Sequence, residues 1–334
     1  MPGLIQRLLA IDSHEVEFAR RGFSCADPQI QIRLENIGRA FLDGYHSALR
    51  HGEQIALVEQ LQQVALEARG FAYEGAAMAL ALFDAMRIHG NALPRFIAGS
   101  GKPHVFMLHV GAGWAYARIP WKRRHIEKVI SKFHPVLGWL IVDGYGFHEG
   151  YFHGRDQGRI TRATARLSVD ARRVFHQGLG RSLWFSNGAD GNAIAHSISN
   201  FALLYREDAW SGVGLACAYA GGISARSIED LRRQAGEYAA AVAQGVAFAA
   251  KARQLAGNPA AHTELACSVL CGMHAEEAAA LCDVAFQQID PFHACTYQHW
   301  RRLLQSFFSS SQTFQRGKSD EYQVTPPVGA TKPH

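Results

Sequence analysis

The sequence predicts a single, mainly α-helical domain over residues 1–308, built from pseudo-repeated helical hairpins that pack through glycine and alanine faces. Three observations predict this class of fold. Glycines recur at a fixed spacing of 67 residues, long stretches show helical periodicity between start and stop signals, and the alternating pattern of half-buried strands is rare. The pattern is compatible with a closed bundle and with a short solenoid.

The repeat is marked by Gly44, Gly111, Gly178 and Gly245, which follow one another at intervals of 67 residues. Each has an apolar residue three positions earlier and an alanine or serine four positions later. Because positions i and i+4 share a helix face, each segment offers a stripe of small residues that lets a second helix backbone approach closely. The alternative is coincidence, since the chain has 32 glycines, but the matched flanking positions favour a repeat.

A second set of glycines, Gly75, Gly150, Gly212 and Gly272, falls between the members of the first set. Each therefore marks a second helix, so that one unit is a helical hairpin, in the size range of known helical repeats. We expect four approximate units, at about residues 30–98, 99–165, 166–230 and 231–300.

Several segments can be assigned in chain order. Helical periodicity covers residues 55–68 and 70–83, and a long helix is expected over 227–256, where a serine start signal precedes acidic residues and a Gly-Asn-Pro sequence follows the end. Further helices begin near Thr263 and span 275–287. Loops are expected at 99–103, 152–158 and 187–192, and the polar residues 309–334 are expected to form a disordered tail.

Composition excludes several classes of protein. Hydrophobic residues make up 48% of the chain and the net charge is only +5, spread along the sequence, so no nucleic-acid partner is expected. No apolar run reaches the roughly 18–20 residues that span a bilayer, so no membrane span is expected. The 6 cysteines form no CxxC pair, and reduced thiols in a cytoplasmic protein fit best. A homo-oligomer is compatible with the sequence.

The densest group of candidate catalytic residues lies in residues 143–156 and includes His148, Glu149 and His153. One interpretation is an acid/base cluster at the mouth of an apolar pocket. The other is a polar network that caps a helix and satisfies buried groups. The spacing is not that of the HExxH motif, so a zinc-protease site is not predicted.

Glu74 stands beside Gly75 within the otherwise apolar helix over residues 70–83. A glutamate is rarely buried without a partner, so Glu74 either faces water or pairs in the interior. If it pairs, Glu74 and Glu149 face one another across a pseudo-symmetric cavity, where two carboxylates can share a proton or hold a metal. The 17 histidines leave a metal or haem open, and the sequence identifies no particular cofactor.

Aromatic residues near the repeated glycines are candidates for the walls of an apolar cavity, although plain core packing explains them equally well. Arg181 is a further candidate, because a guanidinium can contact an anionic or conjugated ligand. The candidate substrate-binding residues are Phe71, Tyr73, Tyr145, Phe147, Arg181 and Trp184.

The glycine-containing segments also resemble those of a known family, the UnbL-like proteins of enediyne biosynthesis, which share a domain of unknown function. The match extends over about residues 21–304 and keeps the order of several motifs. These are Arg69-Gly70-Phe71-Ala72-Tyr73-Glu74-Gly75, Asp143-Gly144-Tyr145-Gly146-Phe147-His148, Tyr151-Phe152-His153, Gln177-Gly178-Leu179-Gly180-Arg181-Ser182-Leu183-Trp184-Phe185, Ser211-Gly212-Val213-Gly214-Leu215-Ala216 and Ala243-Gln244-Gly245-Val246-Ala247-Phe248-Ala249-Ala250.

The resemblance implies a role in polyketide maturation, in which a linear polyene is converted toward an enediyne-type core. It also implies a long apolar polyene ligand and partnership with other proteins of the same enediyne cassette. It carries over no catalytic residue. Two hypotheses follow: an oxidative or cyclising tailoring enzyme that acts on the polyene, or a non-catalytic helical-repeat scaffold or hydrophobic-ligand carrier for partner enzymes.

Overall fold

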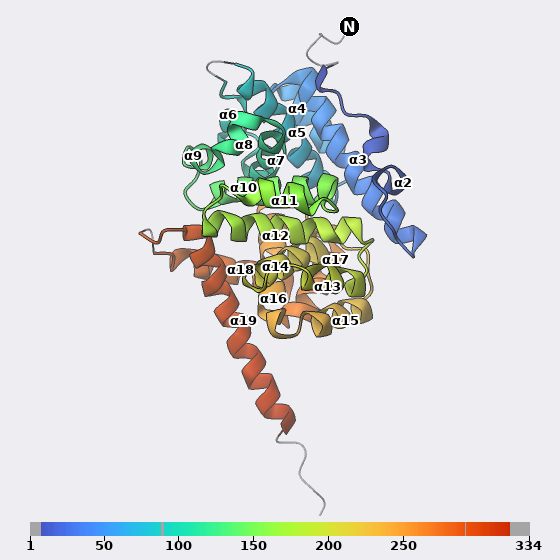
Figure 1. Ribbon diagram of the computed structural model, residues 1–334, viewed down its shortest axis with the longest axis vertical. Coiled ribbons are helices and arrows are strands. Elements are labelled where there is room, and N and C mark those ends of the chain that lie inside the picture. Colours follow the sequence, from blue (N-terminus) through green and yellow to red (C-terminus); the bar gives the residue numbers. More distant parts are fainter. Residues whose placement is uncertain (1–7, 88–89, 291, 321–334) are drawn as a thin grey trace, which may run out of the picture.

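The computed structural model (Figure 1) describes residues 8–87, 90–290 and 292–320, and every regular element in these ranges is helical. The prediction of a mainly α fold is therefore confirmed. The body of the protein is a series of long helices, here called the stack helices, each of which packs against the next in the chain. They are α3 (Pro28–His51), α5 (Arg69–Ala85), α7 (Val105–Arg118), α10 (Leu140–His153), α12 (Val169–Ser186), α14 (Leu203–Ala220) and α16 (Ala239–Ala256).

Shorter elements connect and cover the stack helices. They are η1 (Ser13–Val16), α2 (Phe18–Arg21), α4 (Ile55–Gln63), α6 (Ala92–Ala98), η2 (Lys102–His104), α8 (Pro120–Arg124), α9 (Ile126–Ile130), η3 (Leu137–Trp139), α11 (Gln157–Thr164), α13 (Gly191–Ser199), α15 (Ala225–Ala235), η4 (Gly236–Tyr238), α17 (Ala261–Ala266), η5 (Cys267–Cys271), α18 (Ala275–Gln287) and α19 (Thr296–Asp320). In Figure 1, α12 crosses the middle of the molecule and α19 extends away from its body.

Neighbouring stack helices touch backbone to backbone through a Gly-x-Gly pattern. The first glycine faces the preceding helix: a Cβ on Gly178 would lie 2.0 Å from the carbonyl oxygen of Asp143. The second glycine faces the following helix: a Cβ on Gly180 would lie 2.0 Å from the carbonyl oxygen of Ala209. Only glycine permits such an approach, and the resulting Cα–H to carbonyl contacts, together with tight packing, offset its roughly 1 kcal/mol helix cost.

The first-glycine contact recurs through the stack with one register. In each pair, the carbonyl belongs to a residue of the preceding stack helix. That residue stands immediately before the position equivalent to the glycine. The pairs are Gly75 with Phe41, Gly111 with Glu74, Gly144 with Val110, Gly178 with Asp143, Gly212 with Gln177, and Gly245 with Ser211. The register defines a unit of about 34 residues that contains one stack helix, and two such units make up the 67-residue spacing seen in the sequence.

Three glycines of the expected repeat occupy different places. Gly44 is a second-type glycine, which faces Ala72 of the following helix. Gly150 meets the side chain of Ser182, and the position equivalent to Gly75 in α10 is Gly144. Gly272 follows η5 with φ +70° and lies outside the stack helices. The ranges expected for the four units nevertheless each hold two major helices, the last pair being α16 and α18.

The stack closes on itself, because early helices contact late ones. The ring of Phe71 on α5 lies 5.1 Å from that of Tyr219 on α14, and Arg33 on α3 donates a 2.7 Å hydrogen bond to the carbonyl of Ala220. The start of α19 then enters the interior, where Tyr297 is fully buried. The interior enclosed in this way holds the polar side chains of the candidate site.

Residues 8–23, here called the strap, cross the outside of α3. The backbone N–H of Phe18 donates a 3.1 Å hydrogen bond to Glu35, and that of Ile11 donates to His46 at 3.3 Å. Val16 packs directly against Gly38, where an added Cβ would lie 2.7 Å from the Cβ of Val16. The strap is therefore fixed to α3 by backbone hydrogen bonds and by one close apolar contact.

Two segments differ from their expected structure. The helix expected over residues 227–256 is broken at Gly236, whose φ of +55° ends α15 before α16 begins. Residues 309–320 of the expected tail continue α19, and residues 321–334 lie outside the described residues.

Over the described ranges, no single helix has the length and apolarity needed to cross a membrane. The two segments Ala261–Cys271 and Ala275–Gln287 are long and apolar enough only when they are counted together. The chain bends by 67° at the break between them.

Candidate functional site

A cavity lies among α3, α5, α7, α10 and α12, and the strap covers one side of it. Aromatic and aliphatic side chains make up most of its wall, to which Ile11, Glu15 and Val16 of the strap contribute. The other charged residues of the lining are Glu74, Arg118 and Arg181. The cavity volume is about 70 Å³, which is space for about two water molecules. The aromatic side chains of the wall are Phe41, Phe71, Trp114, Phe147, Tyr151, Phe152 and Phe185.

Glu74 on α5 is a carboxyl group in this apolar wall, with only 3% of its surface exposed. The indole N–H of Trp114 donates a 3.0 Å hydrogen bond to its Oε1. Burial is the largest influence on Glu74 and raises its pKa to about 7, with Asp143 adding to the rise while Arg181 and Trp114 oppose it. A carboxyl group with this pKa changes protonation state near neutral pH.

Arg181 on α12 links two buried carboxyl groups. Its NH1 donates a hydrogen bond to Oδ1 of Asp143, and its NH2 lies 3.9 Å from Oε1 of Glu74. The guanidinium also lies over the ring of Phe147, 4.9 Å from the centroid, in a cation–π contact. The site therefore combines two carboxyl groups and one guanidinium against an aromatic surface.

The polar network continues into the interior of the ring. Gln177 donates a 2.8 Å hydrogen bond to Oδ2 of Asp143 and a 2.9 Å hydrogen bond to the hydroxyl of Tyr297. All of these side chains are almost completely buried. The structure thus holds Asp143 between Arg181 and Gln177, so that Arg181 cannot turn away without leaving a buried carboxyl group unpaired.

Sequence reasoning missed the partner of Glu74, although a signal for it was present. Glu74, Asp143 and Gln177 each stand immediately before the glycine that faces the preceding stack helix, which is Gly75, Gly144 or Gly178. When the stack helices are aligned at a period of about 34 residues, these three residues occupy the same position of the repeat. The 67-residue alignment instead paired Glu74 with Glu149.

The predicted catalytic residues on α10 do not converge on Glu74. Glu149 lies in a separate pocket, where Arg159 donates hydrogen bonds of 2.7 and 3.3 Å to it. Burial raises the pKa of Glu149, but hydrogen bonds from His148 and Arg159 outweigh burial and hold the pKa at about 2. His148 contacts Glu149 at 3.3 Å, and its ring lies 5.8 Å from that of Trp114. His153 lines a third, outer pocket.

The predicted binding residues divide into two groups. Phe71, Phe147 and Arg181 line the cavity that holds Glu74. Tyr73 instead stacks on His104 at 3.8 Å between ring centroids, and the fully buried Trp184 donates a 3.1 Å hydrogen bond to the carbonyl of Gly221. The sixth such residue, Tyr145, lines the pocket that contains Glu149.

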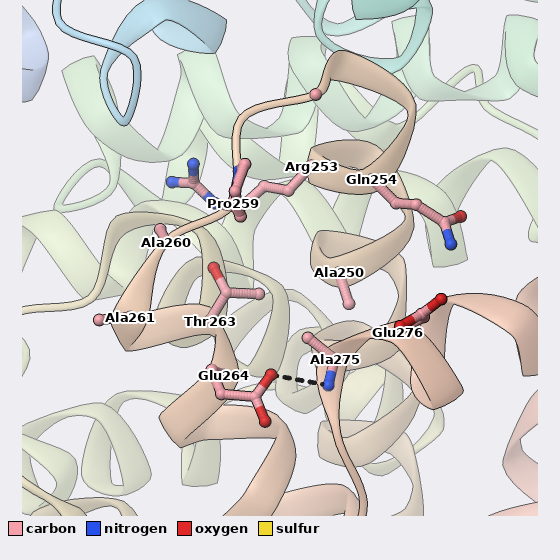
Figure 2. Close-up of a pocket in the computed structure, with 11 residues that line it drawn as sticks. Ala250, Arg253, Gln254, Pro259, Ala260, Ala261, Thr263, Glu264, Ala275 and Glu276 are labelled. Carbon is pink, nitrogen blue, oxygen red and sulfur yellow. Dashed lines mark hydrogen bonds between the residues drawn. The ribbon is translucent and has the colours of Figure 1, made fainter.

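A larger hollow, with a volume of about 550 Å³, lies between α16, α17 and α18 (Figure 2). Its lining mixes small residues with polar ones, and Glu264 accepts a hydrogen bond of 3.0 Å from the backbone N–H of Ala275 at the start of α18. Figure 2 shows the guanidinium of Arg253 turned away from the hollow. This guanidinium donates hydrogen bonds to the backbone carbonyls of Tyr219 and Asn258. The polar groups here serve the local fold, so the cavity around Glu74 is the better candidate site.

Potential metal ligands are dispersed over the described chain: no three His, Cys, Asp or Glu side chains lie close enough together there to hold an ion.

The fold and site together define an all-α protein in which stacked helices enclose an aromatic cavity with a buried Glu–Arg–Asp network. The chain belongs to the family described as protein of unknown function (DUF1702), whose profile matches residues 2–308. Searches of curated proteins and of solved structures found no match.

Proposed function

We propose that the cavity around Glu74 binds a long, apolar, conjugated ligand and that the protein acts in polyketide biosynthesis, converting a linear polyene toward an enediyne-type core. The resemblance to enediyne-biosynthesis proteins supports the class of ligand. The aromatic wall supports it independently, because a conjugated chain packs favourably on aromatic faces. The observation that carries the proposal is the placement of Glu74, with a pKa of about 7, in that wall.

In this proposal Glu74 is the proton-transferring residue. Near neutral pH both of its protonation states are populated, so it can donate a proton to the bound ligand and take one back as the ligand rearranges. A cyclisation or a double-bond migration balances in this way, since the proton given equals the proton recovered. Arg181 and Asp143 position Glu74 and keep the charge near it fixed.

The ligand must displace part of the strap in order to enter. A cavity of about 70 Å³ is far below the roughly 300–1,000 Å³ typical of small-molecule sites. Ile11, Glu15 and Val16 form the part of the wall that does not belong to a stack helix. We therefore expect binding to be slow and to depend on movement of the strap.

A non-catalytic carrier is the second candidate, and one observation favours it. Arg181, Asp143 and Gln177 satisfy one another within the protein, as a purely structural network does. A carrier would bind the polyene in the same cavity, return it unchanged and deliver it to partner enzymes of the cassette.

The two candidates are separated by Glu74→Gln, with Glu149→Gln as its matched control. If Glu74 transfers the proton, Glu74→Gln binds the polyene as the wild type does, as seen in its visible spectrum, but forms no product. Because the product is an isomer of the polyene with the same mass, it is detected by chromatographic separation and by its own absorption spectrum. Glu149→Gln, altered in another pocket, retains product formation. Equal product from wild type and Glu74→Gln would exclude Glu74 from the chemistry, and loss of binding in both variants would point to misfolding, which thermal unfolding checks.

A further inference from the structure

A second pocket, enclosed by α8, α10 and α11, is lined mainly by arginine. Arg123, Arg124, Arg159, Arg162 and Arg166 all contribute to it, and its volume is about 310 Å³. It shares no lining residue with the cavity around Glu74.

Glu149 is the one acidic side chain in the lining of this pocket, and it is already engaged by Arg159. Five guanidinium groups against one carboxylate leave an excess of four positive charges. Arg162 lies 3.9 Å from Asp156 outside the lining, which reduces the excess to about three. Like charges gathered in one pocket repel one another, so an anion that enters is attracted by several of them at once.

The pocket is a built feature of the fold. Glu149 is only 1% exposed, and its two hydrogen bonds from Arg159 fix the direction of that guanidinium. Arg123 donates a 3.2 Å hydrogen bond to the carbonyl of Ala117, which ties α8 to the end of α7. Tyr145 forms the buried floor, where its hydroxyl lies 3.4 Å from the carbonyl of Ala163.

Two arginines retain their full donor capacity. In the described part of the chain, the guanidinium groups of Arg124 and Arg166 have no hydrogen bond and no ion pair, and both residues line the pocket. A guanidinium carries five N–H donors in a planar fork that matches the oxygens of a phosphate group. The lining contains no lysine, and arginine is preferred over lysine where two oxygens of one group are bound together.

We propose that this arginine pocket binds the phosphate monoester group of a soluble ligand. Arg124 and Arg166 bind its oxygens directly, while Arg159, held by Glu149, supplies a fixed positive charge. A monoester dianion matches the excess charge better than a single carboxylate, and its three terminal oxygens can each accept hydrogen bonds from a separate guanidinium. The site is independent of the cavity around Glu74, so either proposal can fail without the other.

Isothermal titration of the full-length protein with inorganic phosphate and with glycerol phosphate tests this site at physiological ionic strength. We expect saturable binding of both, at least tenfold tighter than binding of acetate. Arg124→Gln and Arg166→Gln should each weaken binding about fivefold to tenfold, the loss of one charge-assisted interaction. Arg226→Gln, which removes an exposed arginine of α15, is the matched control and should leave binding unchanged.

Three results would overturn the proposal. One is the absence of saturable phosphate binding to the wild type. Another is an equal affinity in wild type, Arg124→Gln and Arg166→Gln, with unfolding temperatures that show all three to be folded. The last is binding to vesicles that contain phosphatidic acid without binding of the soluble phosphates, which would identify the arginines as a membrane contact.

Discussion

The indole N–H of Trp114 donates a 3.0 Å hydrogen bond to Oε1 of Glu74, although 40 residues separate them in the sequence. The contact follows from the glycine register of the stack. Gly111, one helical turn before Trp114, lies against the carbonyl of Glu74 and brings the two backbones together. The feature that packs the helices therefore also delivers Trp114 to the buried carboxyl group.

The raised pKa of Glu74 makes a pH-dependent contribution to stability. The group has an ordinary pKa of 4.5 and a pKa of about 7 in the folded protein, so its favourable contribution is complete below pH 4.5 and is lost as pH rises through 7. At 1.36 kcal/mol per pKa unit, the loss is about 3 kcal/mol. Glu74→Gln does not titrate, so urea unfolding should show its stability relative to wild type rising by about that amount from pH 4.5 to pH 8.

Trp114→Phe provides the comparison for this pH dependence. In the wild type, the hydrogen bond from Trp114 favours the ionised form of Glu74. Without it, the pKa of Glu74 should rise further, and the pH-dependent loss of stability should move to higher pH. A constant stability difference between wild type and Glu74→Gln across this pH range would show that Glu74 is not held in a desolvated state.

Arg181 and Asp143 should be strongly coupled. Arg181→Met leaves Asp143 buried without its guanidinium partner and should cost about 3–5 kcal/mol in the free energy of unfolding. Combining it with Asp143→Asn removes the unpaired charge, so the double variant should lose less than the sum of the single losses. Chemical denaturation of the four proteins measures the coupling, and additive losses would argue against a direct ion pair.

The glycine register can be tested by a single methyl group. In Gly178→Ala the added Cβ would lie 2.0 Å from the carbonyl oxygen of Asp143, so α10 and α12 must separate, at a cost of about 3 kcal/mol or more. Gly191→Ala is the matched control, because its Cβ meets nothing closer than Leu231 at 3.5 Å. Thermal unfolding should show a change below about 0.5 kcal/mol for the control. Similar midpoints for both variants would contradict the close backbone contact.

Loosening the strap should speed ligand entry. Phe18 is 3% exposed and belongs to the buried apolar core, so Phe18→Ala removes an apolar side chain that anchors the strap to the body. We expect faster tryptic cleavage at Arg20 and Arg21 and faster association of a polyene in stopped-flow absorption. Leu8→Ala, at a position that is 75% exposed on the same segment, is the control and should leave both rates unchanged. Unchanged rates in Phe18→Ala would show that the ligand enters elsewhere.

Much of the fold could be predicted because glycine in a helix is costly and needs a packing reason. Gly111, Gly178 and Gly245 occupy equivalent positions in the structure, as their spacing suggests. The true unit was harder to find, because the connections between successive stack helices differ in length. In addition, α10 contains Gly150 as well as Gly144 and Gly146. Choosing among these three glycines requires knowing which carbonyl each one faces.

The candidate site was predictable in part for a similar reason. A glutamate in an apolar helix must either face water or find a partner, and this argument singled out Glu74. Asp143 and Arg181 lie on the neighbouring helices α10 and α12, but Arg181 reaches Glu74 on α5 only because the stack closes. Periodicity within one helix gives no information about such closure. The sequence therefore placed Asp143 in the candidate group at 143–156 but did not pair it with Arg181.

Incubating the purified protein with a linear polyene shows whether the cavity around Glu74 holds and converts such a ligand. The visible absorption and the mass of the polyene are followed with and without the other cassette proteins. We predict a spectral shift on binding to the wild-type protein, followed by a product that Glu74→Gln does not form. If the protein changes neither the spectrum nor the mass in any combination, the proposed function is contradicted.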